Sequence, residues 1–131
     1  REIINLVEEF VKEHPNAYIY HSLGRKVYLS VMTHVDAVVG NSSSGLYEAP
    51  SFKKPTVNIG DRQKGRLMAS SVINCAPERG EILKAIKKAF VMDCSDTVNP
   101  YGDGKSSKRI VKVIKSIKEY KALLKKRFYD F

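Results

Sequence analysis

Three groups of polar residues lie between positions 40 and 66 and could together bind a nucleoside diphosphate. A run of small residues, 41–45, follows an apolar segment, Glu48 comes three positions later, and Arg62, Lys64 and Arg66 follow the next apolar segment. Serine hydroxyls and the free amides at a helix start bind phosphate oxygens, and arginine binds them through paired N–H groups. A carboxylate can accept both ribose hydroxyls. The spacing therefore predicts a phosphate site with a ribose-binding carboxylate beside it.

The serine loop and Glu48 also have ordinary structural explanations. One of Ser42, Ser43 and Ser44 could be a helix N-cap, but one N-cap accounts for one serine and not for three. Gly45 would let the backbone approach a phosphate closely. Glu48 could be a solvated acid in the first turn of a helix. Because Gly45 stands where a capping box needs Ser or Thr, Glu48 is not engaged in that motif and is free for a ligand.

The basic loop and the histidines give weaker signals. Solvation explains Lys64 equally well, whereas Arg62 comes directly after a predicted strand and is expected to contact the ligand. His34 falls late in a helix, where an imidazolium complements the helix dipole, and His21 ends a predicted strand and borders the site. The sequence offers no nucleophile–base pair and no metal-ligand spacing, so we expect no catalytic group, metal or cofactor from this chain.

The apolar periodicity predicts an α/β domain. Helices are predicted over 1–14, 24–35, 44–51, 79–91 and from 106 onward, and strands over 17–20, 37–39, 56–59 and 71–74. The apolar run 37–39 is typical of a strand buried on both faces of a parallel sheet. Alternating strands and helices indicate a Rossmann-like parallel sheet flanked by helices. Ligands bind beyond the carboxyl ends of such strands, where His21, the Asn41 loop and the Asp61 loop should converge.

Length, composition and charge exclude several classes of protein. A chain of 131 residues is one domain at most, and its 43% hydrophobic content suffices for a core. No apolar run reaches membrane-spanning length, and Cys75 and Cys94 indicate two reduced thiols in a cytoplasmic protein. The net charge of +9 concentrates in 105–127, on a helix whose other face is apolar. A solvated helix face explains this better than nucleic-acid binding, for which no motif is present.

Four segments carry a family resemblance: residues 40–45, 48–52, 55–66 and 99–104. They resemble the UDP-N-acetylglucosamine 2-epimerase family, in particular its hydrolysing branch. The run Gly-Asp-Arg-Gln-Lys-Gly-Arg at 60–66 is the most specific, whereas the serine loop with 48–51 is shared more widely among nucleotide-sugar enzymes. Lys53 and Lys54 depart from the pattern, because relatives usually have a glycine there.

The resemblance implies a two-domain GT-B-type fold, of which residues 1–131 would be a partial C-terminal nucleotide-binding domain. The first strands of this domain and the whole N-terminal domain, which supplies the catalytic groups, would be absent, and the helix from 106 to 131 would dock on that missing domain. The implied partners are UDP or a UDP-sugar, and the full-length protein would be a homo-oligomer.

The resemblance also assigns roles to single residues. It implies that Ser42 and Ser43, with Ser44 and Gly45 beside them, hold the diphosphate, Glu48 the ribose and Arg62 the phosphate side of the site. Leu23 would lie beside the uracil. His21 and Ser22, together with Lys64 and Arg66, would line a cleft or regulatory site.

The implied reaction converts UDP-N-acetylglucosamine and water to N-acetylmannosamine and UDP, a precursor step of sialic-acid type, and this chain alone would be inactive. The alternatives are a non-hydrolysing epimerase, a GT-B glycosyltransferase and, from another class, a basic nucleic-acid-binding module.

Overall fold

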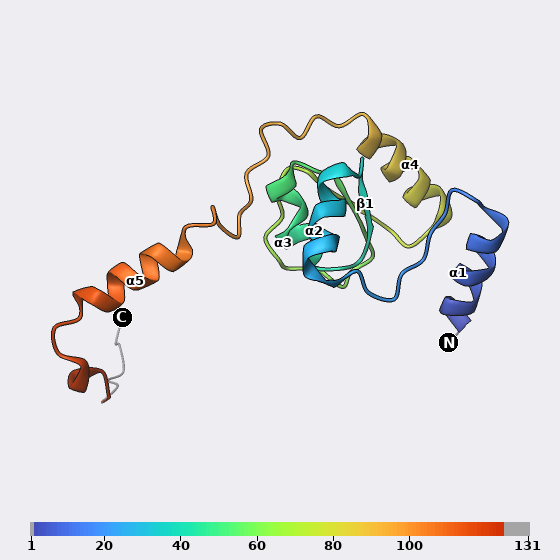
Figure 1. The fold of residues 1–131 in the computed structure, drawn as a ribbon. Coiled ribbons are helices and arrows are strands. Elements are labelled where there is room, and N and C mark those ends of the chain that lie inside the picture. The colour runs from blue at the N-terminus through green and yellow to red at the C-terminus, as the bar shows by residue number, and fades with distance from the viewer. Residues whose placement is uncertain (1, 125–131) are drawn as a thin grey trace.

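The computed structural model describes residues 2–124 as a small parallel sheet with helices around it (Figure 1). The elements are α1 (Glu2–Glu13), α2 (Gly24–His34), β1 (Val38–Gly40), α3 (Ser44–Tyr47), the 3-10 helix η1 (Ala49–Phe52), β2 (Thr56–Ile59), β3 (Val72–Cys75), α4 (Arg79–Phe90), α5 (Ser106–Ser116) and the 3-10 helix η2 (Tyr120–Leu124).

The sheet has the order β1-β2-β3, and both strand pairs are parallel. At its carboxyl edge Gly40 lies opposite Asn58, and Asn58 lies opposite Asn74. The loops that follow β1 and β2 therefore leave the sheet side by side. The expected fold class, a Rossmann-like parallel sheet as in the C-terminal half of GT-B enzymes, is confirmed.

Successive side chains of β2 point to opposite faces of the sheet. Val57 is fully buried and packs with Ala85 and Ala89 of α4, and Ile59 and Ile73 lie against this cluster. Thr56 points the other way, toward α3, where its hydroxyl donates to the carbonyl of Gly45 at 2.9 Å. The sheet is thus a layer between α4 on one side and α3 with η1 on the other.

The predicted helix over 44–51 is divided in two at Glu48, where α3 gives way to η1. Pro50 lies in the first turn of η1, where a missing N–H costs no hydrogen bond. Lys53 ends η1 in the left-handed conformation with φ 57°. This is the region where relatives were expected to have glycine, and the left-handed conformation gives the reason.

The predicted strand over 17–20 does not form. Its tyrosines, Tyr18 and Tyr20, are exposed, and no neighbouring strand pairs with the segment. A β-favouring composition does not make a strand without a ladder partner. The neighbouring strand β1 is consequently an edge, and Val39, predicted to be buried on both faces, is 46% exposed.

The last predicted helix is shorter than its apolar period suggests. Helix α5 ends at Ser116, because Ile117 takes an extended conformation with ψ 115°, and the short η2 follows. The β-branched residues of α5 are poor helix formers in isolation, and packing does not compensate here because they are exposed. The continuation of the predicted helix to 131 falls partly outside the described residues.

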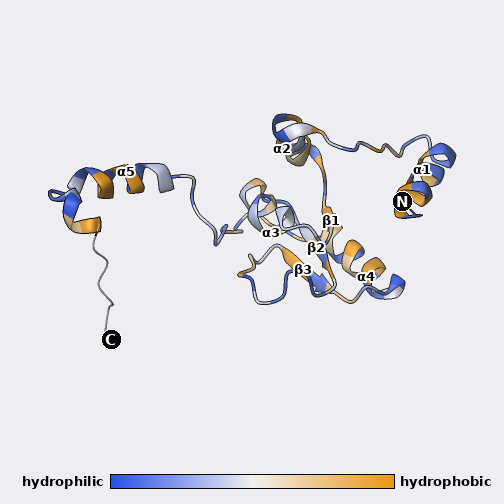
Figure 2. Cartoon of the chain, turned by 90° about the horizontal axis from the view of Figure 1, so that it is seen from below, coloured by the Kyte–Doolittle hydropathy of each residue, from blue (hydrophilic) through white to orange (hydrophobic). Residues whose placement is uncertain are grey.

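Helices α1 and α5 extend from the sheet layer at opposite ends of the picture (Figure 1). Each carries apolar and charged residues on different sides (Figure 2), and neither contains a buried residue. Helix α2 buries only Met32, and its apolar residues Val27, Tyr28 and Val31 are exposed. Among the described residues, no helix combines the length and apolarity that crossing a bilayer requires.

Candidate functional site

The two loops predicted to bind phosphate meet at the carboxyl edge of the sheet. Each leaves its strand through a glycine with positive φ, 148° at Gly40 and 73° at Gly60, a conformation that side chains other than glycine rarely adopt. Arg62 then donates from Nη1 to Asn41 Oδ1 at 3.4 Å, and Gln63 donates from Nε2 to the Asn41 carbonyl at 2.7 Å. The predicted convergence of these two loops is thus present in the structure.

The serine loop uses several of its donors internally. The Ser44 amide donates to Ser42 Oγ at 3.3 Å, and the amides of Leu46 and Tyr47 donate to the Ser43 carbonyl at 3.0 and 2.9 Å. Helix α3 has only four residues, so it carries little of the dipole that a longer helix directs at an anion. Hydroxyl groups and Arg62, more than the helix itself, are therefore the groups at this edge whose chemistry would suit an anion.

Gly45 and Glu48 take positions that the sequence did not predict. Gly45 is buried against β2, and a Cβ there would lie 2.5 Å from Thr56 Cγ2. Its smallness therefore serves the packing of α3 on the sheet. Glu48 was expected in the first turn of a helix, but it follows α3 as its C-cap and is half-buried.

A second group of predicted residues lies before α2. His21, Ser22 and Leu23 line a hollow of about 600 Å³ together with Arg25 and Tyr28. His21 does not end a strand, because residues 14–23 form none. Of the three strand ends predicted to converge, only those of β1 and β2 therefore do so.

This hollow is connected to the serine loop. Tyr28 Oη and Ser44 Oγ are hydrogen-bonded at 2.5 Å, which places Leu23 and the serines in one neighbourhood. Arg25 and Tyr28 were not among the predicted site residues; they lie in the first turns of α2 and line the hollow beside His21.

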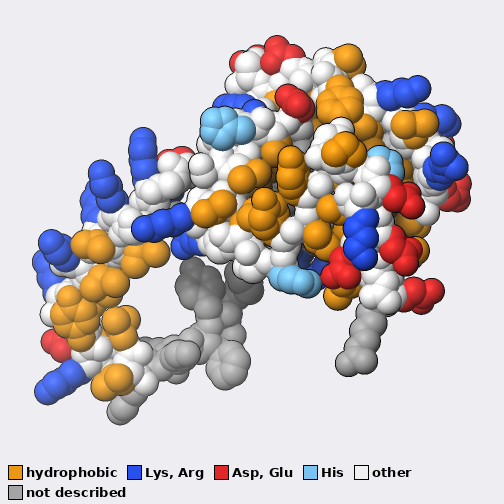
Figure 3. All heavy atoms as spheres, turned by 45° about the vertical axis from the view of Figure 1, so that its right-hand side comes forward, with side chains coloured by type: hydrophobic (Ala, Val, Ile, Leu, Met, Phe, Trp, Pro, Cys, Tyr) orange, Lys and Arg blue, Asp and Glu red, His pale blue; other side chains and the backbone are white. Residues whose placement is uncertain are grey.

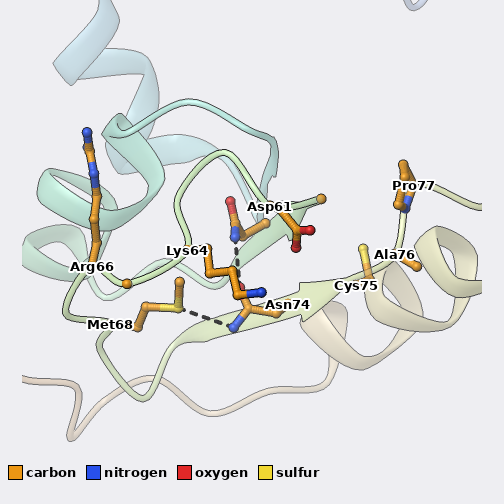
Figure 4. A pocket seen from close by; sticks show the side chains of 11 residues that line it. Asp61, Lys64, Arg66, Met68, Asn74, Cys75, Ala76 and Pro77 are labelled. Carbon is orange, nitrogen blue, oxygen red and sulfur yellow. Dashed lines mark hydrogen bonds between the residues drawn. The ribbon is translucent and has the colours of Figure 1, made fainter.

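A further hollow, of about 730 Å³, opens at the carboxyl ends of β2 and β3 (Figure 4). Asp61, Lys64 and Arg66 line it, but none of the serines, Glu48 or Arg62 does. The Arg66 side chain leads away from the other labelled residues (Figure 4). Its guanidinium instead donates to Tyr47 Oη at 3.1 Å and lies 5.5 Å from the Tyr47 ring centroid.

Cys75 lines the same hollow and is a poor nucleophile there. Burial, and after it the negative charge of Glu81, raise the pKa of its thiol above the ordinary 9.0. The thiol is therefore protonated at neutral pH, and thiolate is the reactive form. The hollow offers binding groups rather than an activated nucleophile.

The turn-rich segment at 99–104 links α3 and η1 to Leu67, which follows the arginine loop. Asn99 Nδ2 donates to the Tyr47 carbonyl at 2.8 Å and to Ser51 Oγ at 2.7 Å, and Tyr101 Oη donates to the Leu67 carbonyl at 3.0 Å. The Tyr47 and Tyr101 rings meet edge to face at 4.2 Å. The sequence identified this segment as a motif but did not predict that its side chains hydrogen-bond to residues beside the candidate site.

Comparisons with known proteins agree with this arrangement. The family model described as UDP-N-acetylglucosamine 2-epimerase matches residues 1–115. The chain is 37% identical over 128 residues to "Polysialic acid biosynthesis protein P7" of Escherichia coli, covering 95% of this chain and 32% of that protein. It is 33% identical over 124 residues to "UDP-N,N'-diacetylbacillosamine 2-epimerase (hydrolyzing)" of Legionella pneumophila, covering 95% of this chain and 33% of that protein.

A solved structure shares the fold. The UDP-GlcNAc 2-epimerase of Methanocaldococcus jannaschii matches this chain with a TM-score of 0.71 at 21% identity. The match covers 87% of this chain and 32% of the solved chain. The chain spans about a third of the length of the curated relatives that it matches. A family model that covers residues 1–115 nevertheless leaves no doubt about the lineage: this chain belongs to the UDP-N-acetylglucosamine 2-epimerase family.

Proposed function

We propose that this chain binds the UDP group of a UDP-sugar at the edge formed by residues 41–48 and 61–66. The observation that carries the proposal is the meeting of the two loops, in which Arg62 and Gln63 both reach Asn41. That contact sets a phosphate-pairing arginine beside a row of serine hydroxyls. Ser42, Ser43 and Ser44 would hold the diphosphate, Glu48 the ribose hydroxyls and Leu23 the uracil side.

The reaction that we propose for the whole enzyme is hydrolytic 2-epimerisation, with UDP as the leaving group. The Legionella relative is named for a hydrolysing reaction, and the Asn-Ser-Ser-Ser loop favours the same branch. The residues described here would stabilise the negative charge that develops on UDP as its bond to the sugar breaks. The catalytic acid and base would come from outside these residues, so the 131-residue chain alone would bind without turnover.

A cytoplasmic location and a homo-oligomeric full-length enzyme belong to the same proposal. The free thiols of Cys75 and Cys94 support the location, since free cysteines are typical of reducing compartments.

Calorimetry with UDP and with uridine tests the assignment. Arg62→Ala should weaken UDP binding by at least about tenfold, the size expected for a charge-assisted hydrogen bond, and should leave uridine binding unchanged. Glu48→Ala should weaken both ligands, because both carry the ribose. The control Glu81→Ala with Lys84→Ala removes one acid and one base that pair with each other on α4, and should change neither affinity.

If the double variant Glu48→Ala with Arg62→Ala binds UDP as tightly as the wild type, these residues do not form the UDP site and the assignment is wrong. The rival function, nucleic-acid binding by the basic residues of 105–127, predicts salt-sensitive retention on an oligonucleotide. If the chain binds the oligonucleotide in a way that UDP does not displace, and does not bind UDP, the rival is correct.

A further inference from the structure

Gln63 is an unusual residue for an exposed basic loop. Its neighbours Arg62 and Lys64 are exposed, whereas Gln63 is 2% exposed and ranks among the largest fully buried side chains of the described chain. Its Oε1 atom is buried without a hydrogen-bond partner. Burying a partly unsatisfied amide is unfavourable compared with an apolar side chain of the same volume. Stability alone therefore does not explain a glutamine at this position.

The amide makes one hydrogen bond, and that bond joins the two loops. Gln63 Nε2 donates to the Asn41 carbonyl at 2.7 Å, across 22 positions of sequence. Asn41 is the residue at which the chain leaves β1 for the serine loop. The neighbouring contact from Arg62 to the Asn41 side chain is longer, at 3.4 Å.

The bonded carbonyl belongs to the peptide unit between Asn41 and Ser42. That unit is trans, and in a planar trans peptide the C=O and the following N–H point in opposite directions. Holding the Asn41 carbonyl against the buried Gln63 amide therefore directs the Ser42 N–H away from Gln63, toward the exposed side of the loop. A rotation of this peptide would aim a carbonyl oxygen where a donor now points, and a carbonyl repels phosphate.

We infer that Gln63 is a positioning residue, which orients the Asn41–Ser42 peptide so that the Ser42 amide faces the diphosphate. The inference rests on the proposed UDP site. Gln63 itself contacts no ligand in this assignment and acts through Asn41. The ligand group concerned is the diphosphate and not the nucleoside.

The test compares UDP and uridine binding in the full 131-residue chain. Gln63→Met keeps the volume and removes the donor, and is expected to weaken UDP binding by about tenfold with uridine binding unchanged. Ser71→Ala is the matched control, because Ser71 is also buried with an unpartnered Oγ but lies outside the site. Both ligands should bind this control as they bind the wild type.

Gln63→Glu gives an independent readout through pH. Its carboxylate cannot donate to the Asn41 carbonyl, but its protonated form can. The UDP affinity of Gln63→Glu, divided by that of the wild type, should therefore be low at pH 8 and rise toward one at pH 5. The same ratio for Gln63→Met should not change with pH. A merely structural role for Gln63 would alter the unfolding midpoint without this recovery.

The outcomes separate the inference from the function on which it rests. If the wild-type chain fails to bind UDP, the proposed function falls and the inference with it. If the wild type binds UDP and Gln63→Met binds UDP equally well, or loses UDP and uridine together, only the inference is overturned. Should Gln63→Met fail to fold, a flat pH ratio for Gln63→Glu would overturn it.

Discussion

Gly45 shows how one residue of a binding motif can be required by packing. The sequence suggested that its role was close approach to a phosphate, and the structure places it against the side chain of Thr56. Thr56 cannot easily move away, because it is 2% exposed and its hydroxyl donates to the Gly45 carbonyl. The position therefore fixes α3 on β2, and only indirectly the serines that precede it.

Gly45→Ala is accordingly expected to lower the free energy of unfolding by about 1–3 kcal/mol, the usual cost of overpacking a core. Thr56→Ser removes the colliding Cγ2 methyl and keeps the hydroxyl, so it should rescue Gly45→Ala. Urea denaturation of both single variants and the double variant measures their coupling.

Gly80→Ala is the control for this cycle. Gly80 lies in α4 with open space around its Cβ position, and alanine favours a helix over glycine, so this variant should be neutral or stabilising. Purely additive effects of Gly45→Ala and Thr56→Ser would show that the contact does not control the packing.

Residue types and their spacing predicted which loops meet in the candidate site better than they predicted how the side chains of those loops are oriented. The meeting of the Asn41 and Arg62 loops followed from parallel strands whose carboxyl ends share an edge. The burial of Gln63 and the turn of Arg66 toward Tyr47 did not follow, because long polar side chains have many rotamers and only tertiary contacts select one. Asn99 and Tyr101 were missed for the related reason that their partners lie about 50 and 34 positions away.

At the scale of elements, prediction was accurate for the buried centre of the sheet layer and failed for two exposed segments. Strand β2 and helix α4 were predicted to within one residue, since Val57, Ala85 and Ala89 form the buried core. The segment 17–20 and the end of α5 were wrong, and both are exposed. The exposed helix α1 was nevertheless predicted to within one residue at each end, so weak burial lowers the accuracy of such a prediction without excluding success.

Asp103 is expected to control how well α5 forms. Its carboxylate accepts the Lys105 amide at 3.0 Å and pairs with Arg109 one turn later. The Lys105 hydrogen bond is the main reason that the pKa of Asp103 lies below the ordinary 3.8, with Arg109 adding to it. A lowered pKa means that the charged form favours the helix.

This contribution should be fully present above pH 3.8 and lost as pH falls through the lower pKa of the folded form. Carbon chemical shifts of α5, followed by NMR from pH 6 to pH 2, should show a drop in helix population. Asp103→Ala should reduce the population at pH 6, and Asp103→Asn less so, because it keeps one acceptor for Lys105. Equal helix populations in all three proteins at pH 6 would contradict this role.

The charge of the whole molecule is divided between its ends. Helix α1 contains four glutamates and one lysine, whereas α5 contains three lysines and one arginine. Figure 3 shows the basic side chains along the arm that carries α5, with apolar side chains beside them. The net charge of +9 thus reflects a basic arm and not a basic binding face over the sheet.

Both end helices also carry an apolar stripe that has no partner among residues 2–124. On α5 the stripe consists of Ile110, Val113 and Ile114, each at least half exposed, and on α1 Leu6 and Phe10 are exposed in the same way. Stripes at helical spacing normally face a core. The docking of residues 106–131 on a further domain remains a prediction, and Phe128, Tyr129 and Phe131 lie outside the described residues.

In the isolated 131-residue chain these stripes should drive self-association, because contiguous exposed apolar surface favours contact between copies. Sedimentation velocity is expected to show an average mass that rises with protein concentration, and more steeply at high salt, which screens repulsion between the basic arms. Val113→Glu with Ile114→Glu should shift the chain toward monomer. Val98→Glu is the control, since Val98 is 77% exposed and belongs to neither stripe, and should not alter association. A single monomeric species at every concentration would mean that the stripes are too small to associate unaided.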